Sequence, residues 1–162
     1  MPVSWNESIA FANWLSKSNK GKYSFGLPTE AQWEYSCRAG TKTPYYFGNR
    51  INKSQVNYDG NNTTPVGKYP PNSFGLYDMH GNAWEWCKDW FGQYNQAVAN
   101  NPIGPSTGSA RVLRGGSWNG SARDCRSANR YGYEPGERYG SWGLRLALPR
   151  GHQVIMPNNQ KK

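Results

Sequence analysis

Apolar residues near the start of the chain recur at the spacing of an α-helix. In the stretch SWNESIAFANWLSKSNKG, Trp5, Ile9 and Ala12 follow one another at intervals of four and three residues, which places them on one helical face. Ser4 precedes Glu7 by three residues, the spacing of a capping box. The pattern predicts an amphipathic helix of about three to four turns that ends near the glycine closing this stretch.

A second helix is predicted in LPTEAQWEYSCRAG. Thr29 follows a proline and precedes Gln32 by three residues, which is again a capping-box spacing. Gly40 stands where a C-terminal stop is expected, so this helix should be about ten residues long. Residues 41–72 are polar and rich in turn formers, and we expect a long loop there with short strands at most.

In the second half, two short apolar runs, RVLRGGSW and WGLRLAL, predict strands. The chain has 19 Gly and 11 Pro, which favours many loops and argues against a helical bundle. Apolar residues make up 36% and aromatic residues 15%, so the core should rest on a few large rings. The length of 162 residues fits one domain, which we assign to residues 1–150, followed by a polar tail over residues 151–162.

The formal charge is +9, and its placement changes the picture. No Lys occurs from Asp89 to Gln160, whereas eight Arg lie between Arg111 and Arg150. Planar guanidinium groups pair with carboxylates and carbonyls, so we expect most of these Arg to fix loop carbonyls and core carboxylates. The charge is too scattered along the chain for a nucleic-acid interface, and nucleic acid is an unfavoured partner.

Three cysteines, Cys37, Cys87 and Cys125, are an odd number, so at least one thiol has no partner within the chain. The sequence shows no signal peptide and no apolar run long enough to cross a membrane. The expectation is a soluble, cytoplasmic protein without a membrane partner, or one displayed on a phage or cell surface through another component. The sequence does not indicate an oligomeric state.

Five motifs occur in order over residues 2 to 148: PVSW, LPTEAQWEYSCRAG, NSFGLYDMHGNAWEWCKDW, RVLRGGSW and GLRLAL. Together they resemble the formylglycine-generating enzyme, or sulfatase-modifying factor, domain family. The resemblance implies an α+β, C-type-lectin-like fold of the formylglycine-generating-enzyme type. Such a fold would be rich in loops, with two short helices and short antiparallel strands.

In catalytic members of that family, two cysteines five residues apart follow the GGSW-like motif, bind copper and oxidise a substrate cysteine to formylglycine. The corresponding stretch here is NGSARD, which contains no thiol. Cys125 resembles the family cysteine that follows this pair and bridges to the one in WEYSCRAG, here Cys37, so the two should be neighbours, either bonded or reduced. Tight binding of Cu(I) needs several converging thiolates, so we assign no catalytic residue and expect no redox cofactor.

A second branch of the family makes sulfoxides with non-haem iron held by several His. This chain has only His80 and His152, so no facial triad is visible. His80, within DMHGN, is expected in a turn or at the surface. A metal-dependent oxidoreductase of the formylglycine-generating enzyme family is nevertheless kept as the alternative function.

The motif DMHGNAWE resembles a structural calcium site of the family. The ligands it implies are two carboxylates and two backbone carbonyls, from Asp78, Glu85, Gly81 and Ala83. Such hard oxygen ligands suit calcium. The alternative is that these carboxylates pair with buried arginines such as Arg114 or Arg145.

The segment WNGSARDCRSANRYGYEPGERYGSW resembles a paratope, because Tyr and Trp provide rigid contact area while Ser, Gly and Asn adapt their hydrogen bonds. The variable proteins of diversity-generating retroelements use the same segment of this fold, with randomised codons derived from an Asn codon. Asn, Asp, Ser, Gly and Tyr are reachable by changing adenines in that codon, whereas Glu134, Glu137 and Trp142 are not. The alternative is that Tyr and Gly only build loops.

The sequence thus predicts a non-catalytic ligand-binding module whose segment 118–142 forms a variable-type surface for a protein or glycan. The residues expected in an exposed contact face are Trp118, Asn119, Ser121, Asp124, Tyr131, Tyr133, Tyr139, Ser141 and Trp142.

Overall fold

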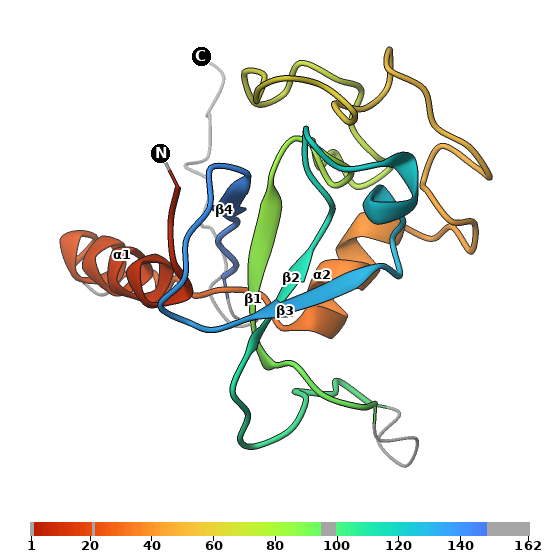
Figure 1. The fold of residues 1–162 in the computed structure, drawn as a ribbon. Helices are drawn as coiled ribbons and strands as arrows, with labels where there is room; N and C mark the ends of the chain where they lie inside the picture. The colour runs from red at the N-terminus through yellow and green to blue at the C-terminus, as the bar shows by residue number, and fades with distance from the viewer. Residues whose placement is uncertain (1, 21, 95–99, 149–162) are drawn as a thin grey trace, which may run out of the picture.

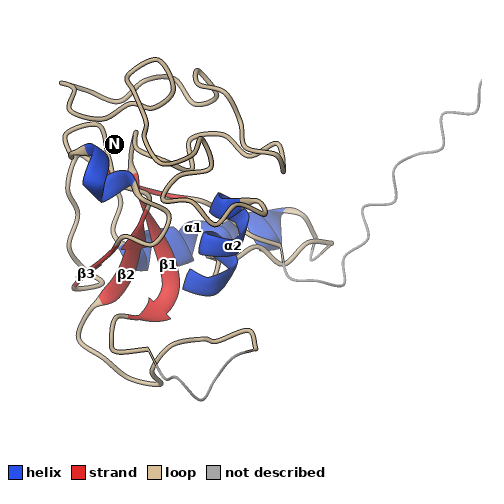
Figure 2. Cartoon of the chain, turned by 90° about the vertical axis from the view of Figure 1, so that its right-hand side faces the viewer, coloured by secondary structure: helices blue, strands red, loops and turns tan. Residues whose placement is uncertain are grey.

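The computed structural model describes residues 2–20, 22–94 and 100–148, so the predicted tail over residues 151–162 lies outside the described residues. Long loops connect a few short helices and strands (Figures 1 and 2). In chain order the elements are α1 (Trp5–Ser18), α2 (Glu30–Arg38), β1 (Trp84–Trp90), β2 (Arg111–Arg114), the 3-10 helix η1 (Ala122–Cys125), β3 (Arg130–Tyr133) and β4 (Trp142–Leu144). None of the described helices is long and apolar enough to cross a membrane.

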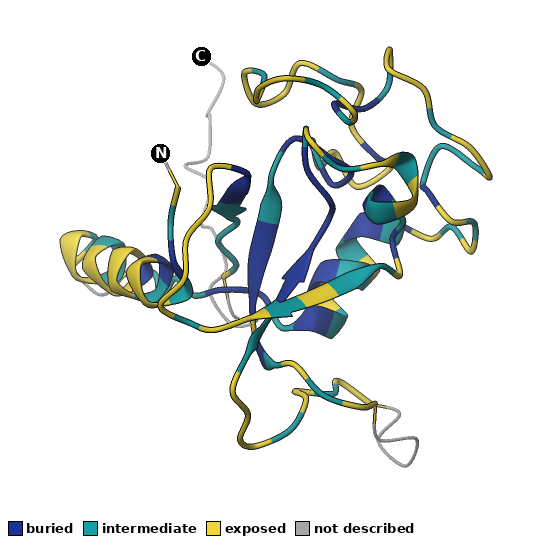
Figure 3. Ribbon diagram, in the orientation of Figure 1, coloured by how far each residue is buried: buried dark blue, intermediate teal, exposed yellow. Residues whose placement is uncertain are grey.

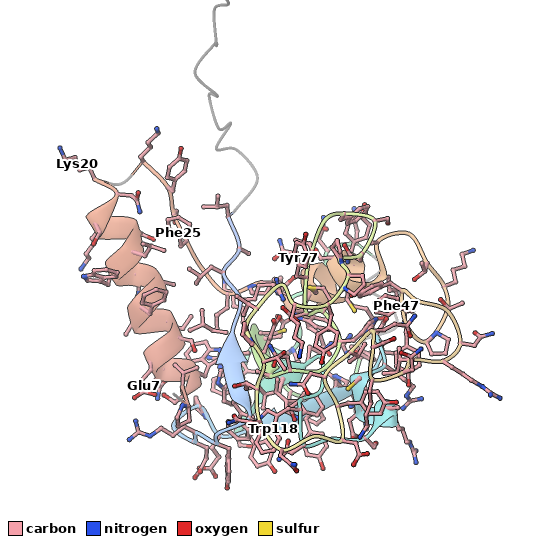
Figure 4. All side chains as sticks on the ribbon, turned by 90° about the horizontal axis from the view of Figure 1, so that it is seen from above. Glu7, Lys20, Phe25, Phe47, Tyr77 and Trp118 are labelled. Carbon is pink, nitrogen blue, oxygen red and sulfur yellow. The ribbon has the colours of Figure 1, made fainter. Side chains whose placement is uncertain are left out.

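Both predicted helices begin at their capping boxes. The Ser4 hydroxyl accepts from the backbone N–H of Glu7 at 3.2 Å, and the Glu7 carboxylate accepts from the Ser4 N–H at 2.8 Å. Thr29 and Gln32 make the equivalent pair at the start of α2. The stop of α2 lies one residue earlier than predicted, because Ala39 already takes the left-handed conformation with φ 45°. In Figure 4, α1 lies at one side of the domain, apart from the loop body.

The four strands form one sheet in the order β3-β2-β1-β4. β2 pairs antiparallel with both β1 and β3, but β4 runs parallel to β1, with Trp142 opposite Trp84. The expectation of antiparallel strands is therefore wrong for β4. Residues 134–141 carry the chain back along the sheet after β3, so β4 starts at the same end of the sheet as β1. This return loop is fixed to α1, because the N–H of Asn6 donates to the carbonyl of Pro135 at 3.2 Å.

The core lies on both faces of β1 and β2, which are the most deeply buried strands (Figure 3). On one face, Trp33 of α2 packs with Cys87 and Val112. On the other face, Trp86 packs with Leu113. Alternate residues of each strand thus serve opposite layers, and the predicted core of a few large rings is confirmed.

The guanidinium of Arg114, at the end of β2, is completely buried. It donates to the carbonyls of Asn129 at 2.6 Å and Ser127 at 2.8 Å, and it also donates to the Glu34 carboxylate. A second carboxylate, that of Glu30, lies 3.6 Å away. Arg114 therefore joins β2, α2 and the chain between η1 and β3.

Two further arginines, Arg130 and Arg145, also bind carboxylates. Arg130 holds the Glu30 carboxylate with two hydrogen bonds of 2.7 and 2.6 Å and donates to the carbonyl of Gly92 at 2.6 Å. Arg145 holds both carboxylate oxygens of Glu85 at 2.7 and 2.8 Å. The expectation that these arginines fix carboxylates and loop carbonyls is confirmed for all three.

We predict that Arg114→Met lowers the free energy of unfolding by about 3–5 kcal/mol, because the carbonyls of Ser127 and Asn129 lose their donor and two carboxylates of α2 each lose one of their two cations. Arg138→Met is the matched control. Arg138 pairs with Glu7 at the surface, where the two side chains are 61% and 48% exposed, and its loss should cost far less because solvent screens such a pair. Urea unfolding of both variants measures the difference, and equal losses would contradict the role of Arg114.

Candidate functional site

A cavity of about 280 Å³ lies beside the sheet, between β3, the start of β4 and the loop that contains η1. It brings together most of the contact residues predicted from the sequence. Those that line it are Asn119, Asp124, Tyr131, Tyr133, Tyr139, Ser141 and Trp142. Trp118 and Ser121 are not among its lining residues.

Aromatic rings form one wall of this cavity. Tyr131 and Tyr133 alternate with inward residues of β3, and their rings stack at 5.8 Å with an angle of 15°. Tyr133 and Tyr139 each lie 4.5 Å from the ring of Trp142, and Tyr131 lies 5.7 Å from the ring of Trp84. Tyr131 and Tyr139 are each 50% exposed, so the wall combines ordered packing with large accessible ring area.

The prediction that Ser141 and Trp142 are exposed is wrong. Trp142 is only 6% exposed because it begins β4 and packs edge-on against Trp86 at 5.1 Å. Ser141 is 9% exposed because its carbonyl accepts from the N–H of Trp84 at 2.9 Å. Pairing with β1 therefore turns these two residues into the floor of the cavity.

A carboxylate and an amide form the polar rim. One oxygen of Asp124 accepts from the N–H of Ser121 at 2.9 Å and from its hydroxyl at 2.8 Å, which caps η1. The amide oxygen of Asn119 accepts from the hydroxyl of Ser117 at 2.7 Å. Ser121 itself is exposed beside the cavity and orients Asp124.

Trp118 has a different place from the one predicted. The backbone N–H of Trp118 donates to the carbonyl of Asn82 at 3.1 Å, and its backbone carbonyl accepts from the N–H of Gly60 at 2.6 Å. The indole nitrogen is buried and has no partner among the described residues. Figure 4 shows Trp118 at the edge of the loop body, on the opposite side from Tyr77 in that view. Trp118 therefore fastens neighbouring loops beside the cavity.

The sequence prediction missed Trp84, which lines the cavity from the start of β1. The available signal was the alternating pattern of WEWCKDW, which is typical of a strand. A strand predicted there would have placed Trp84 next to a paired strand, as it is next to β4.

Glu85 is one of the four residues predicted as calcium ligands. Both oxygens of Glu85 accept from Arg145, and one also accepts from the indole N–H of Trp33 at 2.7 Å. For Glu85 this is the arginine pairing that the sequence left open.

The other three candidate ligands, Asp78, Gly81 and Ala83, lie in the loop that precedes β1. One Asp78 oxygen accepts from the N–H of Gly67 at 2.7 Å, whereas the second is buried without a partner among the described residues. The carbonyl of Gly81 accepts from the N–H of Ala83 at 2.9 Å. Calcium at this loop stays a prediction.

All three cysteines are buried and unbonded. Cys37 and Cys125 both lie beside His80: the Cys37 sulfur is 3.7 Å from Nδ1, and the Cys125 carbonyl is 2.7 Å from the same atom. Burial raises the pKa of both thiols to about 12. Among the described residues, no group of three or more His, Cys, Asp or Glu side chains could hold a metal ion. These residues do not fit a copper centre, which needs converging thiolates.

His80 lies in a bend of the chain, in line with the expected turn, but only 2% of its surface is exposed, so the alternative expectation of a surface position is wrong. The Cys125 carbonyl can only accept, so Nδ1 carries the proton, and Nε2 accepts from the N–H of Tyr46 at 3.0 Å. Burial lowers the pKa of His80 to about 4. The ring is therefore a neutral structural link between the loop at Tyr46 and the end of η1.

Comparison with protein-family models matches residues 1–149 to the sulfatase-modifying factor enzyme 1-like domain. The chain belongs to this family. It is 41% identical over 150 residues to a serine/threonine-protein kinase pkn1 of Chlamydia caviae, which covers 90% of this chain and 23% of the relative. It is 38% identical over 167 residues to a formylglycine-generating enzyme of Streptomyces coelicolor, which covers 90% of this chain and 51% of the enzyme. The chain thus spans about a quarter of the length of the first relative and about half of the length of the second.

Among solved structures, Treponema denticola variable protein 1 is similar, with a TM-score of 0.82 and 32% identity. The match covers 90% of this chain and 69% of that chain. The expected α+β fold of the formylglycine-generating-enzyme type is confirmed. A variable protein and formylglycine-generating enzymes are thus both similar to this chain.

His80 should make the domain sensitive to acid. Its pKa is about 4 in the folded protein and 6.5 without burial, so the unfolded chain binds the proton first as the pH falls. The contribution of the neutral, buried His80 ring to the free energy of unfolding is fully present above pH 6.5. We expect about 3 kcal/mol of this free energy to be lost as the pH falls to 4.

His80→Asn should remove this pH dependence, because the amide can still donate to the Cys125 carbonyl but does not titrate. Chemical unfolding of both proteins between pH 4 and pH 7 measures it. Parallel stability curves for the two proteins would show that His80 does not carry the effect.

Proposed function

We propose that this chain is a non-catalytic ligand-binding module and that residues 118–142 present its binding surface. The observation that carries the proposal is the composition of the cavity. Between residues 119 and 141, all of which are described, only Asn, Gly, Asp, Tyr and Ser line it. These are the residue types that dominate adaptable binding surfaces.

The structure separates this surface from the residues that support it. Cys125 and Ser127 are completely buried, and Arg130 points to Glu30, whereas the adjacent Tyr131 is half exposed. Such alternation lets side chains on the surface change while the backbone stays fixed. Binding sites held on rigid elements keep their geometry.

Gly132 continues this division on β3. A Cβ at this position would lie 2.5 Å from the ring of Phe91, so the strand lies directly on that ring. The inner face of β3 is therefore closely packed, while Tyr131 and Tyr133 project from its other face. The two tyrosines have a rigid base, which lowers the entropic cost of binding.

The buried, protonated thiols support a binding role over a redox role. The stretch that carries the catalytic cysteine pair in the enzymes is NGSARD here, and three of its residues, Asn119, Gly120 and Asp124, line the cavity. Polar groups thus occupy the place where the enzymes have thiols. An oxidoreductase has no specific support from the contacts of this site.

The same residues support a variable-type surface, as in the proteins of diversity-generating retroelements. Four residues of segment 118–142 cannot arise from the Asn codon, and none of them occupies the accessible wall. Trp118 lies outside the cavity lining. Trp142 is buried in the floor, and Glu134 and Glu137 lie in the return loop outside the cavity lining. The similarity to a variable protein supports the same reading.

A protein is the partner we favour, because stacked and half-exposed tyrosines are typical anchors for protein surfaces. A binding array of purified proteins and glycans tests this. We predict that at least one protein binds the wild type and that the double variant Tyr131→Ala, Tyr133→Ala weakens this binding by about tenfold or more, because anchor residues carry most of the binding energy.

Tyr35→Ala is the matched control, since Tyr35 is 69% exposed on α2 and does not line this cavity; it should leave binding unchanged. Binding only to glycans would overturn the choice of partner. Ligands that bind all three proteins equally, or oxidation of a cysteine peptide by the copper-loaded protein, would overturn the proposal itself.

The variable-type surface has its own test in the neighbouring DNA. We predict a near-copy of the codons for residues 115–148 with Asn codons at the cavity positions, next to a gene for a reverse transcriptase. Sequencing the flanking region decides this. A single copy without such a gene would contradict diversification and leave a fixed binding surface.

A further inference from the structure

The cavity described above differs in charge from the rest of the chain. The protein carries a formal charge of +9, yet no Lys, Arg or His is among the described residues that line this cavity. Its one carboxylate is that of Asp124. A basic protein thus has a locally acidic binding cavity, which attracts positive charge.

The nearby arginine on β3 does not neutralise this carboxylate. Arg130 points to the other side of the strand, where it is paired with Glu30 and the Gly92 carbonyl. One oxygen of Asp124 caps η1 through Ser121, and the other accepts no hydrogen bond from the described residues. This second oxygen is available to a ligand.

Five aromatic rings surround the same space, those of Trp84, Tyr131, Tyr133, Tyr139 and Trp142. Each is within 6 Å, centre to centre, of at least one other ring of the set. The faces of Trp and Tyr rings attract cations, and a desolvated cation gains more from them than an exposed one. The three tyrosine hydroxyls accept no hydrogen bond from the described residues, so they can accept from a ligand.

We infer that this cavity binds a positively charged side chain, lysine or arginine, of the protein ligand, which lies among the aromatic rings and pairs with Asp124. The inference rests on the proposed function and specifies what the surface recognises. A neutral sugar would also stack on these rings and could donate hydroxyl hydrogen bonds to Asp124, but it would gain neither the attraction between opposite charges nor the attraction of a cation to the ring faces. The charge of the cavity therefore favours the cation.

The test compares two small probes that differ in charge but hardly in shape. Nα-acetyl-arginine amide and Nα-acetyl-citrulline amide are titrated separately into the whole chain, and the ring resonances of Tyr131 and Tyr133 are followed by NMR. We expect the arginine probe to shift these resonances and to bind at least about fivefold more tightly than the citrulline probe.

Asp124→Asn should remove this preference. The amide oxygen can still accept from Ser121, so the cap of η1 is kept while the charge is lost. Glu137→Gln is the matched control, because it removes the same charge from an exposed residue outside the cavity lining. Near-ultraviolet circular dichroism and thermal unfolding check that both variants are folded.

The outcomes separate the inference from the proposed function. Equal binding of the two probes, no shift with the arginine probe at its highest soluble concentration, or an equal effect of both substitutions would overturn the inference. Protein binding in the array that depends on Tyr131 and Tyr133 would then still support the proposed function. If the array shows no such dependence, the proposed function fails whatever the probes do.

Discussion

The buried guanidinium of Arg114 is the interaction on which the rest of the structure depends. The segment from η1 to β3 has little regular structure, so its backbone carbonyls need partners other than a strand ladder. Arg114 provides them for Ser127 and Asn129, and it is itself balanced by carboxylates of α2. A loop that would otherwise be free is thereby fixed to the centre of the sheet, and β3 begins at a defined place.

The separation of frame and surface follows from this arrangement. Because Arg114, Arg130 and His80 hold the loop from inside, the exposed tyrosines of the cavity wall are not needed to keep the backbone in position. Gly116 completes the frame: its φ is +76°, and a Cβ would lie 2.7 Å from the Cys125 sulfur. The chain can approach η1 closely there only with glycine.

Both helices could be predicted from the sequence because their start signals are local. Ser4 with Glu7 and Thr29 with Gln32 make contacts within one turn. The gathering of Asn119, Asp124 and the tyrosines could also be anticipated, since the family resemblance places them in one segment. β1 and β3 were missed because short aromatic strands depend on pairing with distant partners, and the parallel course of β4 depends on a return loop whose path has no local signal.

The errors at His80 and Trp142 have one physical cause. The polar ring of His80 and the aromatic edge of Trp142 both suit a surface position. His80 is buried because the distant Cys125 carbonyl accepts its hydrogen bond, and Trp142 is buried because it packs against the distant ring of Trp86. Sequence composition reports what a side chain is able to contact, whereas burial depends on which partners the topology brings. The floor of the cavity therefore belongs to the core, while its wall is free to serve recognition, and a binding surface of this kind requires both.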